Sequence, residues 1–155
     1  MKSSTVLLEA GELEIPVSFP DLTAFRGWAH STDFPETGRF DWLDGRLEVE
    51  VAPENLATHG SPKSTIAGKL ISLIQDPRLG SVSIDRTRLT CPGANLSVEP
   101  DVLVLLLETL RAGRARFVPT VSGEPGQYIE IEGAADLVVE CVSDGSVRKD
   151  LIRLR

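Results

Sequence analysis

Two short apolar segments of this chain each carry a carboxylate that packing alone does not explain. Asp101 lies in residues 98–107 and Glu140 lies in residues 136–142. Both segments are strand length, rich in Leu and β-branched residues, and without regular alternation, which predicts strands buried on both faces of a sheet. A buried carboxylate is costly unless a cation meets it. Two of them on neighbouring strands therefore predict one shared cation, for which Mg²⁺ or Mn²⁺ is the simplest candidate.

Each carboxylate also has a structural interpretation. Asp101 follows a proline and could cap a turn, and Glu140 could pair with an arginine of the next segment. Taken together, the two acids favour a metal site over the structural interpretation, because a polar turn over residues 143–146 and the basic pair Arg148-Lys149 follow the second acid directly.

The size and composition are those of one globular domain. The chain has 155 residues, of which 41% are hydrophobic and 25% charged, enough for a core of its own. It contains no apolar run long enough to span a membrane, and its first residues do not have the pattern of a signal peptide, so we expect a cytoplasmic protein without a membrane partner. Cys91 and Cys141 fall inside or beside predicted strands, where they are expected to be small buried residues.

The net charge of −7 argues against a strong nonspecific nucleic-acid binder, which would normally be basic. It is compatible with an enzyme whose acidic site is neutralised by metal. Residues 109–118 hold three arginines and no acid, and residues 146–155 hold four basic residues and one acid. These segments indicate either a basic surface around the metal site or two solvated faces.

The hydrophobic pattern predicts hairpins, helices and strands that together form an α/β (α+β) fold, a mixed sheet flanked by helices with N-terminal β-hairpins. Asp44-Gly45 between two extended runs is a strong hairpin signal. Hairpins are expected over residues 5–17 and 39–52, and strands over 81–90, 98–107, 128–132 and 136–142. Helices are expected over 21–30, over 58–74, over 108–119 with a break at Gly113, and from Ser146 onward.

At four places the chain resembles a known family. These are residues 40–45 (Phe-Asp-Trp-Leu-Asp-Gly), His59 at the start of a helix, residues 99–101 (Glu-Pro-Asp), and residues 136–150 with their acid and basic residues. They resemble the Uma2-type endonuclease family, which belongs to the restriction-endonuclease-like PD-(D/E)xK superfamily. The resemblance covers residues 21–155, and residues 1–20 are expected to be an N-terminal hairpin extension.

The resemblance implies metal-assisted hydrolysis of phosphodiester bonds in DNA. Asp101 and Glu140 would ligate Mg²⁺ or Mn²⁺, which polarises the phosphoryl oxygen and lowers the pKa of a bound water. The superfamily places a lysine two residues after the acid, where this chain has Val142, and Lys149 at the start of the last helix would supply that cation instead.

Two further residues, Glu54 and His59, lie where the first core helix of the family begins. They could hold the metal ligands in place, or His59 could make a structural hydrogen bond at the helix start.

Besides Val142 at the lysine position and the negative charge of the chain, two further departures from the family pattern keep an alternative function open. Arg46 stands where relatives usually carry a glutamate, and the chain stops at Arg155 where relatives continue into another strand. A shortened C-terminal element would leave a sheet edge exposed and favour a homodimer. The alternative function is a degenerate, non-catalytic binding or assembly module that retains the nuclease fold.

Overall fold

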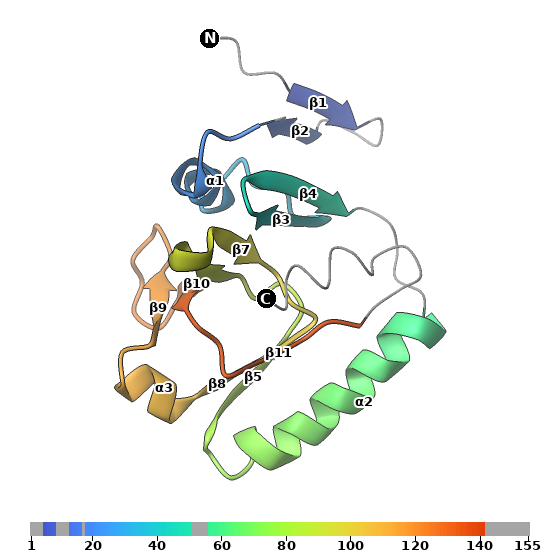
Figure 1. Ribbon diagram of the computed structural model, residues 1–155, viewed down its shortest axis with the longest axis vertical. Helices are drawn as coiled ribbons and strands as arrows, with labels where there is room; N and C mark the ends of the chain where they lie inside the picture. Colours follow the sequence, from blue (N-terminus) through green and yellow to red (C-terminus); the bar gives the residue numbers. More distant parts are fainter. Residues whose placement is uncertain (1–4, 9–12, 17, 51–55, 142–155) are drawn as a thin grey trace.

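A computed structural model describes residues 5–8, 13–16, 18–50 and 56–141, which form a mixed α+β fold of three sheets flanked by helices (Figure 1). The strands are β1 (Thr5–Leu8), β2 (Leu13–Pro16), β3 (Arg39–Leu43), β4 (Arg46–Glu50), β5 (Gly80–Ile84), β6 (Leu89–Cys91), β7 (Leu96–Val98), β8 (Val102–Leu106), β9 (Ala115–Pro119), β10 (Tyr128–Gly133) and β11 (Leu137–Val139). The helices are α1 (Leu22–Ala29), α2 (Ser61–Leu70) and α3 (Leu107–Arg111), with π-helical turns over Leu56–Gly60 and Ile71–Gln75 on either side of α2 and a 3₁₀ turn over Pro92–Ala94.

Helix α1 forms where the sequence predicts it, because Asp21 caps it and its apolar residues share one face. The Asp21 carboxylate accepts a hydrogen bond of 2.8 Å from the amide of Ala24. Phe25 is fully buried, and its ring stacks on that of Trp42 in β3 at a centroid distance of 5.8 Å. The helix therefore covers one face of the larger sheet through an aromatic cluster.

The larger sheet has six strands in the order β4-β3-β7-β6-β10-β9. Strands β6 and β10 are parallel, and the other neighbours are antiparallel, so the sheet is mixed, as predicted. The predicted hairpin at Asp44-Gly45 is confirmed as the connection of β3 to β4. The N-terminal pair β1 and β2 forms a separate two-stranded sheet.

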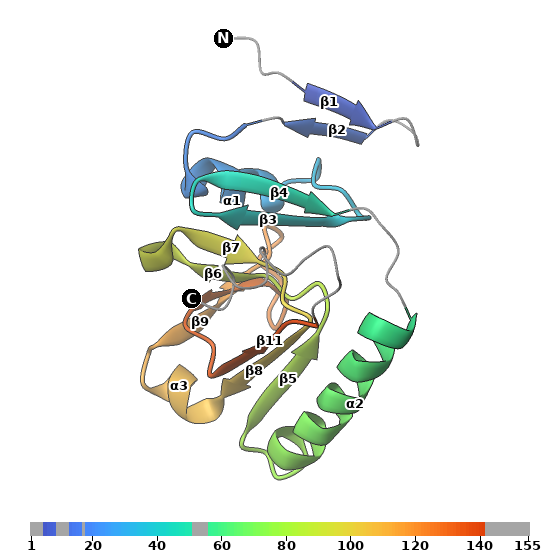
Figure 2. The same cartoon turned by 45° about the vertical axis from the view of Figure 1, so that its right-hand side comes forward.

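The smaller sheet has the order β11-β8-β5 and carries both predicted carboxylate segments, with the long helix that contains α2 alongside it (Figure 2). The two segments are neighbours, as expected, because β11 pairs antiparallel with β8. Strand β8 is central and buried, which confirms the prediction for residues 98–107. Burial of the second segment on both faces was wrong: β11 is a three-residue strand at the edge of the sheet formed by the described residues, and Leu137 is 42% exposed.

Two predicted strands are interrupted by tight turns. The strand expected over residues 81–90 divides into β5 and β6 at Asp85 and Arg86, whose φ angles of 52° and 49° break the extended chain. The strand expected over residues 98–107 divides into β7 and β8 at residues 99–101. These breaks are local turns that hydrophobic pattern alone does not mark.

The helix expected over residues 108–119 breaks near Gly113, as predicted, and only the helical assignment of the residues after the break was wrong. Helix α3 ends at Arg111, and Gly113, with a φ of 69°, lets the chain reverse. The residues that follow form β9, where Phe117 and Val118 pair with β10. Pairing with a distant strand outweighs the helical pattern here.

Some sequence-based expectations fall on residues 51–55 and 142–155, which are outside the described part of the chain. They concern Glu54, Lys149 and the final helix from Ser146. The exposed sheet edge and the homodimer were predicted from that last segment, so they stay predictions. Among the residues that the structure describes, no helix is both long and apolar enough to cross a membrane.

The start of β11 is held in place by Asp136. Its carboxylate accepts hydrogen bonds of 2.7 Å from the amide of Leu106 and 2.6 Å from the hydroxyl of Thr109, at the first turn of α3. Burial acts to raise the pKa of Asp136, but these hydrogen bonds and nearby Arg114 outweigh it, so the pKa lies below the ordinary value of 3.8. Asp136 therefore fixes the strand that leads to Glu140.

This contact predicts a pH-dependent stability. A carboxyl whose pKa is lowered by folding contributes stability that is present above its ordinary pKa of 3.8 and is lost as pH falls through its lower folded value. Asp136→Asn should lower the melting temperature at neutral pH by roughly 2–4 °C, the shift that about 1 kcal/mol produces in a domain of this size. Thermal unfolding measured over an acid series should show the gap between the two proteins closing below pH 3.8. Asp33→Asn, at an exposed acid far from α3, is the control, and a gap that stays constant across the series would contradict the assignment.

Candidate active site

Asp101 lies in the turn that joins β7 to β8 and is almost fully buried. Its side chain is 2% exposed, and Oδ2 accepts a hydrogen bond of 2.6 Å from the amide of Cys141. Its own carbonyl accepts a bond of 3.2 Å from the amide of Asp85. The turn is therefore tied both to the segment after β11 and to the segment after β5.

Glu140 directly follows β11, and the structure brings it to the same place. Its side chain is 1% exposed, and its two carboxylate oxygens lie 2.9 and 3.0 Å from Nη2 of Arg39. The other terminal nitrogen of Arg39, Nη1, lies 3.4 Å from Oδ1 of Asp101. One guanidinium therefore bridges the two acids that the sequence singled out.

Arg39 also contacts a third buried carboxylate, Asp41, two residues along β3. Nε of Arg39 donates to Oδ2 of Asp41 at 3.2 Å, and Oδ1 of Asp41 accepts a bond of 2.9 Å from the amide of Glu99. Burial acts to lower the pKa of Arg39, but Asp41, Glu140 and Asp101 together outweigh it and raise the pKa above its ordinary value. Arg39 is thus charged at any physiological pH, and β3 is joined to both acid-bearing segments.

Residues on the helix that contains α2 approach the same group. Nε2 of His59, in the π-helical turn before α2, lies 3.3 Å from Oδ2 of Asp101. One turn later, the buried Lys63 places Nζ 2.8 Å from Oδ1 of Asp85. Residues four apart lie on the same side of a helix, so His59 meets Asp101 while Lys63 meets Asp85, whose amide is bonded to the Asp101 carbonyl.

Glu99 adds a further ion pair behind the site. Its carboxylate lies 2.5 Å from Nη2 of Arg88, and Arg88 is itself buried against the rings of Phe25 and Phe34. Burial raises the pKa of Glu99, Arg88 opposes that change, and Asp41 adds to it.

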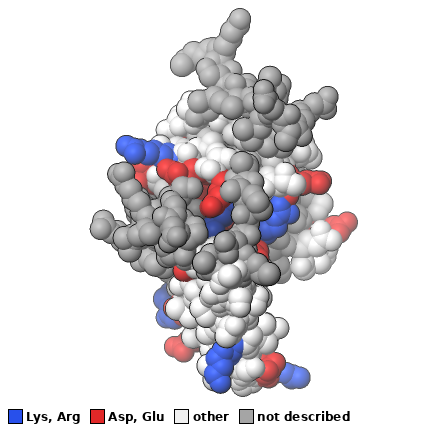
Figure 3. Space-filling model, turned by 90° about the vertical axis from the view of Figure 1, so that its right-hand side faces the viewer, with Lys and Arg blue, Asp and Glu red and all other residues white. Residues whose placement is uncertain are grey.

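A cavity of about 300 Å³ opens beside these groups. It is lined by Gly38, Arg39, Asp85, Arg86, Glu99 and Asp101. Acidic and basic side chains stand close together at mid-height on the face in Figure 3, with no continuous basic surface among the described residues on that face. The cavity therefore offers a mixed charge environment with room for a phosphodiester group.

The sequence identified Asp101, Glu140 and His59, and the structure brings these three together. It missed Arg39 and Asp41. A signal was present for Asp41, because an acid between Phe40 and Trp42 interrupts an apolar strand in the same way as Asp101 does. The arginine that meets Glu140 comes from β3, and Arg46, at the family's usual glutamate position, is exposed.

The donor set fits a hard divalent cation. Mg²⁺ is commonly held by one or two carboxylates together with waters and substrate phosphates, and Asp101 and Glu140 supply two. Among the described residues, no cluster of three or more His, Cys, Asp or Glu side chains is placed to hold a metal. A metal bound by both carboxylates would compete with Arg39 for their oxygens, since the guanidinium already bridges them.

Comparison with known proteins shows both the fold and the family. A crystal structure of a putative nuclease belonging to DUF820 from Anabaena variabilis ATCC 29413 superposes with a TM-score of 0.57 at 19% sequence identity. The match covers 86% of this chain and 66% of that chain, so the present chain spans just under two thirds of its length. A search of curated proteins found no match. The model of the Uma2 family, described as "Putative restriction endonuclease", matches residues 22–153. The chain therefore belongs to the Uma2 family.

Proposed function

We propose that this protein is a Mg²⁺- or Mn²⁺-dependent endonuclease that hydrolyses phosphodiester bonds of DNA. The observation that supports this most strongly is the pair of buried carboxylates, Asp101 and Glu140, on adjoining segments and bridged by one cation. Burying two acids at one point is unfavourable for stability, and such arrangements concentrate at functional sites.

In the proposed reaction, Asp101 and Glu140 would hold the metal, which would supply Lewis-acid activation of the phosphoryl group and of a water. Each protein group then has a separate task. The amide of Cys141 and the imidazole of His59 fix the Asp101 carboxylate by contacts of 2.6 and 3.3 Å. Arg39 lines the cavity and can donate to a phosphate oxygen once a carboxylate is released to the metal.

The cation that stabilises the transition state is proposed to be Lys149. Lys63 is the competing candidate, because it is buried on the helix that carries His59 and is paired with Asp85 at the wall of the cavity. A lysine in either place would offset the negative charge that develops on the phosphoryl oxygens.

One observation favours the non-catalytic alternative. Arg39 already neutralises the acids without a metal, so the same group could serve only to hold β3, the Asp101 turn and β11 together. The two functions differ in what the acids do when metal is added, and this difference can be measured.

The first test combines metal binding with cleavage. Calorimetric titration with Mn²⁺ should show binding to the wild type that is lost in Asp101→Asn and in Glu140→Gln, since each change removes a ligand with little change in volume. The wild type should nick plasmid DNA with Mg²⁺ or Mn²⁺, EDTA should stop it, and both variants should be inactive while their circular dichroism remains that of the folded protein.

Glu124→Gln, at an exposed acid in the β9–β10 loop, is the matched control and should behave as wild type. A wild type that shows no Mn²⁺ binding would refute the proposed function and favour the structural role of Arg39. Metal binding without cleavage of any DNA offered would favour the degenerate module.

The second test assigns the cation. Lys149→Ala should reduce kcat by roughly 10²- to 10³-fold, the scale seen on removing one transition-state electrostatic group, and should leave Mn²⁺ affinity nearly unchanged. Lys63→Gln, which keeps most of the side chain stem and so limits any loss of packing, should remain close to wild type. A large loss of kcat in Lys63→Gln, with Lys149→Ala close to wild type, would assign the transition-state cation to Lys63.

A further inference from the structure

A second cavity, of about 180 Å³, shares one lining residue, Arg86, with the first. Its walls are the end of β5, the segment leading into β6, and the paired strands β9 and β10. Arg86 lines both cavities and so stands between them. A ligand that occupies both cavities would therefore contact Arg86.

The wall on the β9–β10 side is aromatic. The rings of Phe117 and Tyr128 are stacked, with centroids 4.9 Å apart and planes 27° apart, and Tyr128 is 53% exposed. Both rings line the second cavity. An exposed aromatic face beside a pocket of this size matches a nucleobase, which is flat and stacks on aromatic side chains whatever its identity.

The turn that carries Arg86 is held in an unfavourable conformation. Asp85 and Arg86 have φ angles of 52° and 49°, a region in which non-glycine residues are costly. The turn is held by the amide of Asp85, which donates to the carbonyl of Asp101 at 3.2 Å, by Lys63 on the Asp85 carboxylate, and by the Arg86 guanidinium, which donates to the carbonyl of Glu36. These contacts place the Arg86 cation where it lines both cavities, and a guanidinium there can bind a phosphate of a bound strand.

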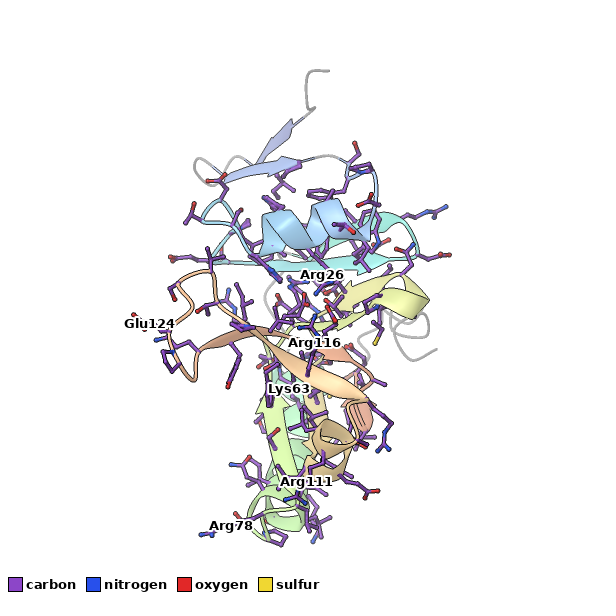
Figure 4. The ribbon with its side chains drawn as sticks, turned by 90° about the vertical axis from the view of Figure 1, so that its left-hand side faces the viewer. Arg26, Lys63, Arg78, Arg111, Arg116 and Glu124 are labelled. Atoms are coloured by element: carbon purple, nitrogen blue, oxygen red, sulfur yellow. The ribbon has the colours of Figure 1, made fainter. Side chains whose placement is uncertain are left out.

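The negative charge of the protein indicates that contacts to DNA bases, more than contacts to the DNA phosphates, supply its affinity for DNA. Duplex binding is dominated by basic contacts to phosphates, whereas this chain has a net charge of −7. On the β9–β10 hairpin, marked by Arg116 and Glu124 in Figure 4, the guanidinium of Arg116 is committed to Glu132 at 2.7 Å. Stacking remains the interaction that the hairpin can offer.

We propose that the second cavity binds an unpaired base of a DNA strand, stacked on Tyr128 and Phe117, while the adjoining phosphodiester lies in the cavity beside Asp101. The inference rests on the proposed function and narrows its substrate class to single-stranded or locally unpaired DNA. A fully paired duplex keeps its bases inside the helix and would present none to this wall.

Binding without cleavage tests this directly. Fluorescence anisotropy in EDTA, with one labelled oligonucleotide as single strand and as blunt duplex, should show tighter binding of the single strand by the full chain. Tyr128→Ala should weaken single-strand binding by roughly 5- to 150-fold, the loss expected for one stacked base, with little effect on the duplex. Tyr128→Phe should restore the affinity because it keeps the ring. Val121→Ala, at an 84% exposed residue between β9 and β10, should bind as wild type.

A readout of stacking separates this site from a general loss of affinity. A single strand containing the fluorescent base 2-aminopurine should be quenched on binding to wild type and Tyr128→Phe, and not to Tyr128→Ala.

Equal single-strand affinity of wild type and Tyr128→Ala would overturn the base site, while loss of cleavage in Asp101→Asn would still support the nuclease. If the wild type binds the single strand, Tyr128→Ala does not, and the wild type never cleaves DNA, the base site would be supported and the nuclease function refuted. A wild type that binds neither form of the oligonucleotide would overturn the base site.

Discussion

The contact of one guanidinium with three buried carboxylates connects the parts of this fold that carry the candidate chemistry. Arg39 reaches Asp41 in its own strand, Asp101 in the turn between β7 and β8, and Glu140 after β11. Two of these acids lie 62 and 101 positions away along the chain, so the contact joins β3 of the larger sheet to both acid-bearing segments. Removing one member of such a buried group typically costs about 3–5 kcal/mol, because the others are left without a partner.

The rest of the larger sheet follows the same principle, with buried charges met by specific partners. Arg88 joins Glu99 and lies over two aromatic rings, and Arg26 of α1 binds Glu130 and Glu132 of β10. Burial acts to raise the pKa of Glu132, but hydrogen bonds from Arg116 and Arg26 outweigh it and lower the pKa. The same sheet thus depends on its aromatic cluster for burial of apolar surface and on its ion pairs for register and for the placement of polar groups.

The sequence predicted most of the local structure because the signals for it are local. Asp21 as a helix cap and Asp44-Gly45 as a hairpin turn require only neighbouring residues, and both predictions are confirmed. The pairing of β8 with β11 also followed from composition, since both segments are short and apolar. The predictions that were wrong depended on distant partners: residues 115–119 form a strand because β10 lies beside them, and β11 is an edge strand because no further described strand pairs with it.

For the site, the sequence located the acids and missed the cation that meets them. A buried acid is visible in sequence as an interruption of an apolar run, whereas its partner is a long side chain from a strand far away in the chain, and no periodicity marks that choice. The role of Arg39 is therefore visible only in the structure. It bears on whether the acids bind a metal, because a metal and this guanidinium would need the same carboxylate oxygens.

Diffraction from crystals grown with Mn²⁺, recorded to show the anomalous signal of the metal, tests this account most directly. If the two acids hold a divalent metal, the map should show a manganese peak bound by oxygens of Asp101 and Glu140, with Arg39 moved away from at least one of them. Crystals at saturating Mn²⁺ with no peak at this position, and with Arg39 still bridging the two carboxylates, would contradict it.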